Sequence, residues 1–397
     1  MQTKPTSRRP DECIPRQLAG SMSAEQEMLR AIARHSGDGS QILLLAERVA
    51  DWESLIRLAD AHRILPMLYR LLTEKGATVP PDAMERLRAE YNRNVFHSIA
   101  NAAELIAVLK VFDEDGILAM PFKGVVLAAS VYHDYMARAA GDLDLIIHQK
   151  DLQRATAILQ ARGYEFTLPV LSDGRTDPNP YEYHFERQAD GRVLEIRWRL
   201  DLTQPGFRRN LGMDWVWPSR RTAKLAGAEV PNMSSEMTLL VLCMHGSKHV
   251  WSRVLWICDI ARLLECSPDL DWERAIREAK KSGLRRSLAL GVLLAYRIAD
   301  ASVPPTVLRR LQSDSAANQL ARHIEENLFE APGNTPMGPV PYSIQLLDFR
   351  DRVTLLLSLD LFRPNEHDRA VLPLPRVFHA LYYLIRPFRI LRDRSPR

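Results

Sequence analysis

The sequence predicts an α+β protein, in which a small mixed β-sheet at about residues 117–200 is flanked by N-terminal and C-terminal helical regions. Two observations support this class. Apolar residues recur at helical spacing before residue 116 and after residue 234, whereas patterns typical of strands are confined to about 117–200. The 397 residues are 46% hydrophobic and 26% charged, which excludes a largely disordered chain and a small disulfide scaffold.

The first segments predict a flexible tail and then a helical region at 21–116. Residues 1–20 are basic and rich in proline, which is typical of a mobile terminus. Ser23 and Gln26 have the spacing of a capping box at the start of a helix. Helical periodicity then covers 42–48, 52–62, 66–74 and, after a break at Pro80 and Pro81, a long helix from 82 to about 113.

The middle of the chain, 117–205, is predicted to be an α/β core. Pro121 restricts the short strand at 117–122 to a sheet edge or a strand end. The remaining segments suit a helix at 123–135, a strand at 142–148, a helix at 151–162, a strand at 164–167, and a hairpin of 181–187 with 192–200 around the turn at 189–191.

The last part of the chain predicts a helical domain at 206–330 and then a linker with a C-terminal helical segment at 331–397. Helical patterns cover 236–266, 272–282, 284–299, 304–312 and 315–328, and later about 345–360 and 375–393. Proline and glycine are frequent between 331 and 341, which is typical of a linker.

The informative pattern for chemistry begins with Asp142 and Asp144, which stand two apart on a predicted strand. Side chains two apart on a strand point to the same face. Two carboxylates at ~4 Å repel each other by ~1 kcal/mol in water and by more near a protein surface. Such a pair suits a cation, and Mg²⁺ prefers one or two carboxylates together with substrate phosphates. The alternative is that Asp142 is a turn residue and Asp144 a solvated strand residue.

Lys123 and Gly124 lie upstream, where a strand meets the start of a helix. A glycine at this point lets backbone N–H groups approach a phosphate at a helix N-terminus. Lys123 could add a point charge to the triphosphate, and Arg138 could add a fork of donors. The alternatives are a solvated loop lysine and a surface ion pair.

A further acid, Glu195, shares one face of the predicted strand at 192–200 with Arg197 and Arg199. The other face is apolar. A carboxylate next to two arginines suits a site that handles metal and phosphate, and the alternative is an amphipathic strand with its polar face in water.

On the predicted helix after 236, His245 and His249 share a face, but Gly246 replaces the glutamate of a zinc-binding HExxH motif. Together with Lys248 this helix is expected to close one side of a nucleotide cleft.

These residues resemble the polymerase-β-type nucleotidyltransferase superfamily, and more closely an uncharacterised bacterial nucleotidyltransferase family found in biosynthetic clusters. The segments that carry the resemblance are FKGVVLAASVYHD, GDLDLII, LEIRWRL and MHGSKHVWSRVLWICDIARLL. The superfamily glycine is normally followed by Ser, and here Val125 takes that position. Its third acid is often Asp, and here it is Glu195.

The resemblance implies a two-metal nucleotidyl transfer, with two Mg²⁺ ions held by Asp142, Asp144 and Glu195 as metal ligands and catalytic residues. Glu195 is also the candidate general base if one metal binds. The residues expected to bind the nucleotide are Lys123, Gly124, Arg138, Arg197 and Lys248.

The predicted function is therefore Mg²⁺-dependent transfer of a nucleoside monophosphate from an NTP, such as ATP, to a small-molecule, peptide or protein acceptor. Val125 motivates the alternative, a non-catalytic nucleotide-binding or accessory protein on the same fold. Nucleic acid is not the expected partner. The segment 376–397 holds six Arg and one Asp, which accounts for the whole formal net charge of +4, so the rest of the chain is close to neutral and lacks a basic surface for nucleic acid.

The expected location is the cytoplasm. The N-terminus has no apolar stretch typical of a signal peptide, and no apolar run has the ~20 residues of a membrane span. The four cysteines are expected to be buried free thiols, because none forms a CxxC pair. The segment 374–397 carries an apolar stripe beside arginines, which favours either packing on the helical domain or weak peripheral contact with an anionic membrane.

Overall fold

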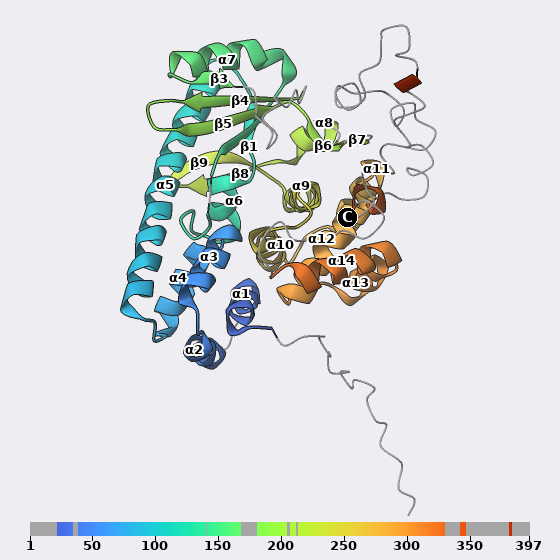
Figure 1. The fold of residues 1–397 in the computed structure, drawn as a ribbon. Coiled ribbons are helices and arrows are strands. Elements are labelled where there is room, and N and C mark those ends of the chain that lie inside the picture. The colour runs from blue at the N-terminus through green and yellow to red at the C-terminus, as the bar shows by residue number, and fades with distance from the viewer. Residues whose placement is uncertain are drawn as a thin grey trace, which may run out of the picture.

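The computed structural model describes residues 22–34, 39–139, 141–167, 181–204, 207–211, 213–329, 342–346 and 381–382. These residues confirm the α+β class, because helices precede and follow a five-stranded mixed sheet (Figure 1). The predicted tail, the linker at 331–341 and, except for two residues, the segment at 374–397 lie outside the described residues.

Four short helices form the predicted N-terminal region: α1 (Ala24–Arg34), α2 (Gly39–Arg48), α3 (Trp52–Ala61) and α4 (Leu65–Lys75). The capping box is confirmed, since the Ser23 N–H donates to Gln26 Oε1 at 3.1 Å and the Gln26 N–H donates to Ser23 Oγ at 3.3 Å. The apolar sides of these helices share one buried cluster with the helices of the C-terminal half. The turn from α3 to α4 holds Arg63 with φ 60°.

The long helix α5 (Pro81–Glu114) follows. It contains an 18-residue stretch of mean hydropathy 1.5, so by length and composition alone it is the one described helix that could cross a membrane. However, 44% of that stretch is buried inside the protein, and Leu105 and Phe112 pack against the sheet. Its buried Glu104 accepts a hydrogen bond from Arg162 at 2.9 Å. These contacts are typical of a core helix.

The five-stranded sheet has the order β1-β2-β5-β4-β3. Its strands are β1 (Ala119–Pro121), β2 (Leu143–Ile147), β3 (Glu165–Thr167), β4 (Glu182–Arg187) and β5 (Arg192–Arg197). β2 and β5 are parallel and all other neighbours are antiparallel. Pro121 lies in an edge strand, as predicted. The helices α6 (Gly124–Val131) and α7 (Leu152–Ala161), with the short η1 (Gln149–Asp151), complete this unit.

The two faces of the sheet pack against different groups of helices. Leu143, Leu145 and Ile147 belong to the cluster formed with α5, α6 and α7. Ile146 belongs to the cluster formed by the remaining helices. Asp144 alternates with Leu143 and Leu145 and therefore shares the face of Ile146, so the predicted alternation along β2 is confirmed. The site residues of this strand thus face the helical body.

The prediction that strands are confined to about 117–200 is wrong. Two further hairpins follow, β6 (Leu200–Gln204) with β7 (Phe207–Leu211) and β8 (Arg220–Leu225) with β9 (Ala228–Met233), and between them lie the short helices α8 (Met213–Val216) and η2 (Trp217–Ser219). Ala226 and Gly227 join β8 to β9 with φ 47° and 86°, which matches the twist of a two-residue hairpin turn. β8 is largely exposed, so it lacks the apolar alternation from which a strand is predicted.

The C-terminal helices are α9 (Ser235–Lys248), α10 (Val254–Cys266), α11 (Trp272–Lys281), α12 (Arg285–Ile298), α13 (Pro305–Gln312), α14 (Ser315–Asn327) and the short α15 (Tyr342–Gln345). The single helix predicted at 236–266 is two helices. Trp251 is fully buried after a turn in which its φ is 53°, and a Cβ on Gly246 would lie 2.4 Å from its ring. The close packing of this ring on α9 explains the break, which places Arg253 before α10.

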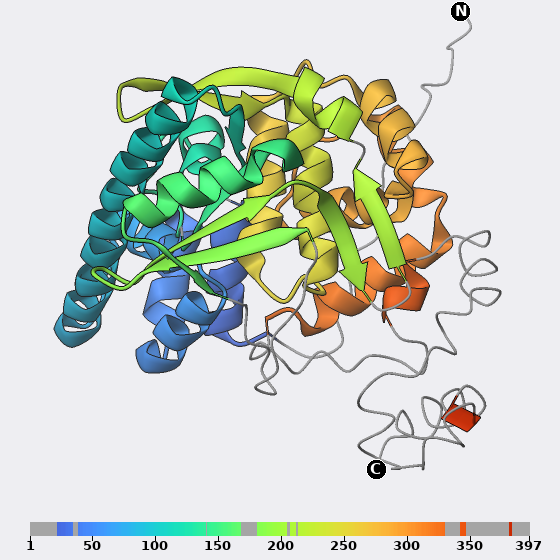
Figure 2. The ribbon, with the colours of Figure 1, turned by 90° about the horizontal axis from the view of Figure 1, so that it is seen from above.

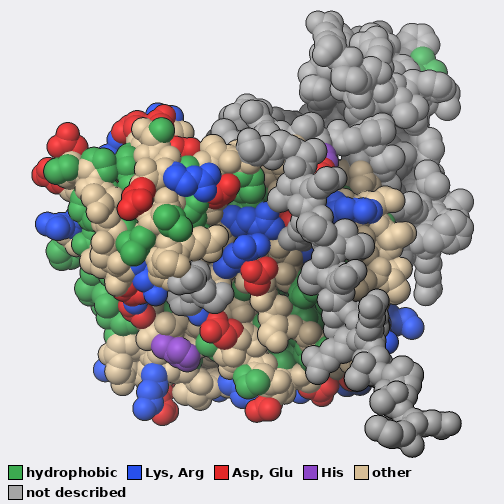
Figure 3. Space-filling model, turned by 90° about the horizontal axis from the view of Figure 1, so that it is seen from below, with side chains coloured by type: hydrophobic (Ala, Val, Ile, Leu, Met, Phe, Trp, Pro, Cys, Tyr) green, Lys and Arg blue, Asp and Glu red, His purple; other side chains and the backbone are tan. Residues whose placement is uncertain are grey.

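These elements leave the sheet between two groups of helices. α5 and the helices α11 to α14 lie at opposite sides of the molecule, with the sheet, α9 and α10 between them (Figure 1, Figure 2). Among the described cysteines, Cys243 and Cys258 are buried free thiols as predicted, whereas Cys266 is exposed. Cys13 lies outside the described residues. On the face seen in Figure 3, acidic and basic side chains are interspersed.

Candidate active site

Three carboxylates meet at the parallel pair of strands β2 and β5. Asp142 directly precedes β2, and Asp144 lies within it with 5% of its surface exposed. Asp144 and Glu195 are direct partners in the register of the parallel pair, and Glu195 is 9% exposed. One oxygen from each of the three side chains lies within 4.8 Å of the others. The structure therefore brings the three predicted acids together in a set that could hold a metal ion.

Lys123 and Gly124 lie beside these acids at the junction of β1 and α6. Lys123 caps α6 with φ 65° and ψ −157°, a backbone conformation that costs energy for a residue with a side chain. Its Nζ lies 3.0 Å from Asp144 Oδ1. Gly124 has φ 53°, and a Cβ there would lie 3.4 Å from the Asp142 carbonyl oxygen. The positive φ, rather than a lack of space for a side chain, favours glycine here, and this turn holds the lysine against the carboxylates.

The antiparallel strand β4 adds two residues that the sequence analysis missed, Glu182 and His184. Glu182 pairs in register with Arg197, and His184 pairs with Glu195. Arg197 binds Glu182 at 2.6 Å and Glu195 at 2.5 Å. His184 binds Glu182 and lies 3.5 Å from Glu195. Glu182, His184 and Glu195 form a second group with ligand atoms close enough to hold a metal.

A cavity of about 370 Å³ opens between these strands and the start of α10. All eight predicted site residues line it, which are Lys123, Gly124, Arg138, Asp142, Asp144, Glu195, Arg197 and Lys248. The walls also include Arg63, Glu182, His245, His249, Arg253 and Trp256. The cavity therefore combines clustered carboxylates with a ring of cationic side chains.

The buried carboxylates differ in their affinity for protons. Burial raises the pKa of Asp144 well above its usual range, although Lys123 opposes this shift. Burial acts in the same direction on Glu195, but the adjacent Arg197 holds its pKa below the usual value. Asp144 Oδ1 is buried and, although it is ion-paired with Lys123, it accepts no hydrogen bond from a described residue. Three carboxylates and a buried oxygen of this kind fit a hard divalent cation such as Mg²⁺.

The basic side chains of the cavity differ in whether a carboxylate already binds them. Arg138 donates from Nε and Nη2 to the two oxygens of Asp259, both at 2.8 Å, and the pair is buried. Arg138 was predicted to bind the nucleotide, but its fork of donors is already occupied by this carboxylate. Lys248 carries no such pair, and burial, with Arg197 nearby, lowers its pKa.

The imidazoles of the cavity are neutral at physiological pH. Burial lowers the pKa of His249 to about 4 and that of His245 well below its usual range, and nearby Lys248 and Lys123 contribute to these shifts. Both rings line the cavity, as expected of a helix that forms one wall of the cleft.

Val125, which replaces the usual serine, points away from the cavity. It is 2% exposed and belongs to the cluster between the sheet and α5. The Val125 side chain therefore contributes to the packing of the core.

A strand–glycine–helix junction beside three carboxylates on neighbouring parallel strands is the arrangement expected of an enzyme that transfers nucleotides. A family model described as "Uncharacterised nucleotidyltransferase" matches residues 48–300, and the chain belongs to this family. No curated protein matches the chain by sequence. Among solved structures, it resembles the lincosamide antibiotic adenylyltransferase LnuA in its lincomycin-bound form, with 16% identity, 35% of this chain and 83% of that chain covered, and a TM-score of 0.26. A similarity of this size gives no basis for assigning an acceptor.

Proposed function

We propose that the protein is a Mg²⁺-dependent nucleotidyltransferase that moves a nucleoside monophosphate from an NTP to an acceptor hydroxyl. The observation that carries the proposal is the convergence of Asp142, Asp144 and Glu195 within 4.8 Å inside a cavity that also holds Lys123, Arg197 and Lys248. Carboxylates and cations in one cavity match the two parts of a metal–nucleotide complex.

The acids have distinct tasks in this proposal. Asp142 and Asp144 would hold Mg²⁺, and together with Glu195 they would hold a second ion. Such ions would supply charge stabilisation for the entering and leaving oxygens of an in-line displacement. If only one ion binds, Glu195, whose pKa the adjacent Arg197 holds below its usual value, would instead accept the proton of the acceptor hydroxyl.

The cations orient the nucleotide. Lys123, at 3.0 Å, and Arg197, at 3.9 Å, are the cations beside Asp144 Oδ1, and the flexible stem of Lys123 allows it to turn to the triphosphate. Lys248 lies in the same wall without a carboxylate bound bidentately to it, so it is a second partner for phosphate oxygens. Arg197 is fixed by Glu182 and Glu195 and therefore positions Glu195. We assign Arg138 a structural role, because Asp259 occupies its donors.

In the proposed reaction, one bond to the α-phosphorus forms as another breaks. The acceptor oxygen forms a bond to the α-phosphorus, and the bond from that phosphorus to the pyrophosphate oxygen breaks. The hydroxyl proton goes to Glu195 or to solvent, and pyrophosphate leaves. Small molecules, peptides and proteins all carry suitable hydroxyls, and we expect the reaction to take place in the cytoplasm.

The direct test is transfer of label. The protein is incubated with each α-³²P-labelled NTP, Mg²⁺ and a cell extract, and labelled products are separated by size. We expect a labelled product with at least one NTP, and loss of that product for Asp144→Asn. Glu165→Gln, an exposed change on β3 outside the cavity, is the matched control and should retain activity. Absence of labelled product with every NTP would contradict the proposal.

The alternative, a non-catalytic nucleotide-binding or accessory protein, is favoured by Val125 and by the pairing of Lys123 with Asp144, which partly offsets the carboxylate charge without metal. The two functions differ in the metal dependence of NTP binding. A catalytic site binds the nucleotide with Mg²⁺, whereas an accessory site binds it equally well in EDTA or does not bind it.

A further inference from the structure

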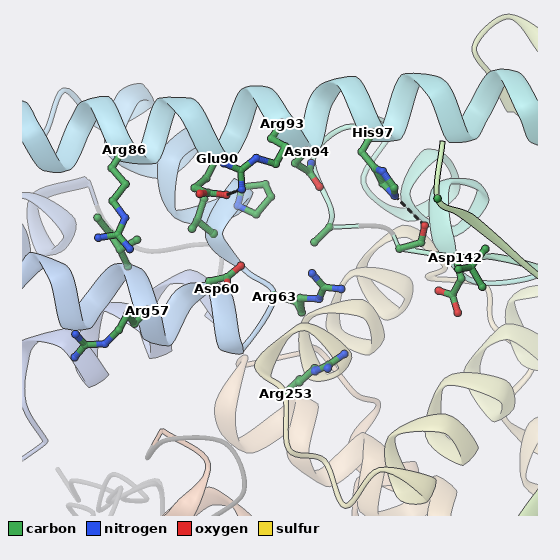
Figure 4. A pocket seen from close by; sticks show the side chains of 17 residues that line it. Arg57, Asp60, Arg63, Arg86, Glu90, Arg93, Asn94, His97, Asp142 and Arg253 are labelled. Carbon is green, nitrogen blue, oxygen red and sulfur yellow. Dashed lines mark hydrogen bonds and ion pairs between the residues drawn. The ribbon is translucent and has the colours of Figure 1, made fainter. Parts of the chain in front are cut away.

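A second and larger cavity, of about 1120 Å³, adjoins the candidate active site. The turn between α3 and α4, helix α5, the loop at 139–142 and the turn between β4 and β5 surround it (Figure 4). Both cavities share Arg63, Asp142 and Arg253 among their lining residues. Lys123, Gly124 and Asp144 line only the smaller one. Asp142 and the two arginines therefore mark the junction between the spaces.

The larger cavity is lined by five arginines and three acids, Asp60, Glu90 and Asp142. Three of the arginines are paired with glutamates. Arg57 lies 4.0 Å from Glu53 on the same helix, Arg86 of α5 binds the same Glu53, and Arg93 binds Glu90 at 2.8 Å. Because each of these arginines already has a carboxylate partner, they add less to the preference for an anionic ligand.

Arg63 and Arg253 differ from the other three. Both are exposed, and within the described part of the chain neither forms an ion pair with a carboxylate. Arg253 lies over the Trp256 ring, 5.4 Å from its centroid. The two guanidinium groups enter the same space in front of Asp142 (Figure 4). Partial burial of its stem lowers the pKa of Arg253, the like charge of Arg63 lowers it further, and Asp142 opposes both effects.

The backbone holds these two side chains in place. Arg63 has φ 60°, in the left-handed region that non-glycine residues rarely adopt. Arg253 lies two residues after Trp251, and Val250 and Trp251, with φ 55° and 53°, turn the chain between α9 and α10. The Asp142 carboxylate near Arg253 offsets only part of the two like charges, which leaves a net positive charge that favours an anion.

We propose that Arg63 and Arg253 bind an anionic group, a phosphate or a carboxylate, on the small-molecule acceptor of the transfer reaction. This inference rests on the proposed function. The nucleotide's own phosphates are the less suitable ligand, since Lys123 and Gly124 line only the smaller cavity. A volume of this order accommodates a small molecule. The acceptor hydroxyl then lies toward Asp142, and its anionic group lies between the arginines.

Binding of inorganic phosphate and of acetate tests this site without knowledge of the acceptor. Each anion is titrated by calorimetry into the protein saturated with Mg²⁺ and α,β-methylene-ATP, so that the nucleotide's subsites are filled. We expect at least one anion to bind, and the tighter one identifies the group. Arg63→Gln and Arg253→Gln should each weaken this binding by about tenfold or more, since each removes charge-assisted hydrogen bonds.

Two matched variants in the same cavity sharpen the result. Arg57→Gln removes a charge already bound to Glu53 and should change anion binding by less than about twofold. Asp60→Asn removes an unfavourable acid and should tighten it. Both arginine variants should melt close to wild type, because their side chains are exposed, and Arg253→Lys should retain part of the binding.

The outcomes separate this inference from the proposed function. Absence of binding by either anion, displacement of phosphate by the nucleotide analogue, or loss of analogue binding in Arg63→Gln and Arg253→Gln would overturn the assignment of these arginines to the acceptor. If the wild type binds the α,β-methylene analogue of none of the four NTPs, the proposed function fails. In that case the anion titration is repeated without nucleotide. Anion binding that is unchanged in Lys123→Met but lost in Arg63→Gln and Arg253→Gln would still support the anion site. Anion binding that is lost in Lys123→Met but unchanged in the arginine variants would overturn it.

Discussion

Replacing Arg138 with methionine tests whether this arginine is structural, as its contacts indicate, or binds the nucleotide, as its sequence context predicts. The change leaves Asp259, whose exposed surface is 0%, without two hydrogen bonds of 2.8 Å each. Among the described side chains, the Tyr132 hydroxyl, at 2.9 Å, is the one that continues to donate to it. Removing one partner of a buried ion pair typically costs about 3–5 kcal/mol, because the other charge stays buried. We expect a loss of this size in the free energy of unfolding.

A second substitution separates the charge from the packing. Asp259→Asn in the Arg138→Met background removes the buried negative charge but keeps an oxygen for the Tyr132 hydroxyl. The double variant should therefore be more stable than Arg138→Met alone in equilibrium guanidinium denaturation. In calorimetry it should also bind Mg²⁺ and α,β-methylene-ATP about as tightly as wild type. The structural interpretation is refuted if Arg138→Met costs less than about 1 kcal/mol, or if the double variant folds well but no longer binds the nucleotide.

Three further predictions concern the carboxylates and the glycine junction. Lys123→Met should bind Mn²⁺ alone at least as tightly as wild type, because Lys123 competes with the metal for Asp144. The same variant should bind the Mn²⁺–nucleotide complex more weakly, because it lacks a cation for the triphosphate. An equal loss of both affinities in calorimetry would argue against these two roles of Lys123. Mn²⁺ binding should tighten as pH rises and then level off, because burial raises the pKa of Asp144 and the metal must displace a proton below that pKa; titrations between pH 5 and 9 that show no trend would contradict the shift. Val125→Ser should lower the free energy of unfolding by about 1–3 kcal/mol without improving nucleotide affinity, since this side chain is buried against α5; a clear gain in affinity would show that the missing hydroxyl matters.

The strands of the site could be predicted from the sequence because their pattern is local. Alternation along β2 puts Asp142 and Asp144 on one face, and the structure places that face toward the cavity. Glu182 and His184 were within reach of the same reasoning. The hairpin was predicted with its turn at 189–191, and once Arg187 is paired with Arg192, the register sets His184 opposite Glu195.

Other features depend on contacts between distant segments, which periodicity does not reveal. Arg138 and Asp259 lie 121 residues apart in the sequence, so the sequence shows the donor without its acceptor. The break between α9 and α10 depends on the Trp251 ring against Gly246. The cavity with Arg63 and Arg253 forms only where the α3–α4 turn meets that break. The hairpin β8–β9 was missed for another reason, because its first strand is mostly exposed and lacks an apolar alternation.

The central claim is that Asp142, Asp144 and Glu195 hold a divalent metal through which the nucleotide binds. The most direct measurement is calorimetric titration of α,β-methylene-ATP into wild type and Asp144→Asn, each with Mg²⁺ and with EDTA. We predict binding to the wild type with Mg²⁺, and weakening by about tenfold or more in EDTA and in the variant. Binding of equal strength in all four titrations, or no binding of the α,β-methylene analogue of any of the four NTPs to the wild type with Mg²⁺, would contradict this claim.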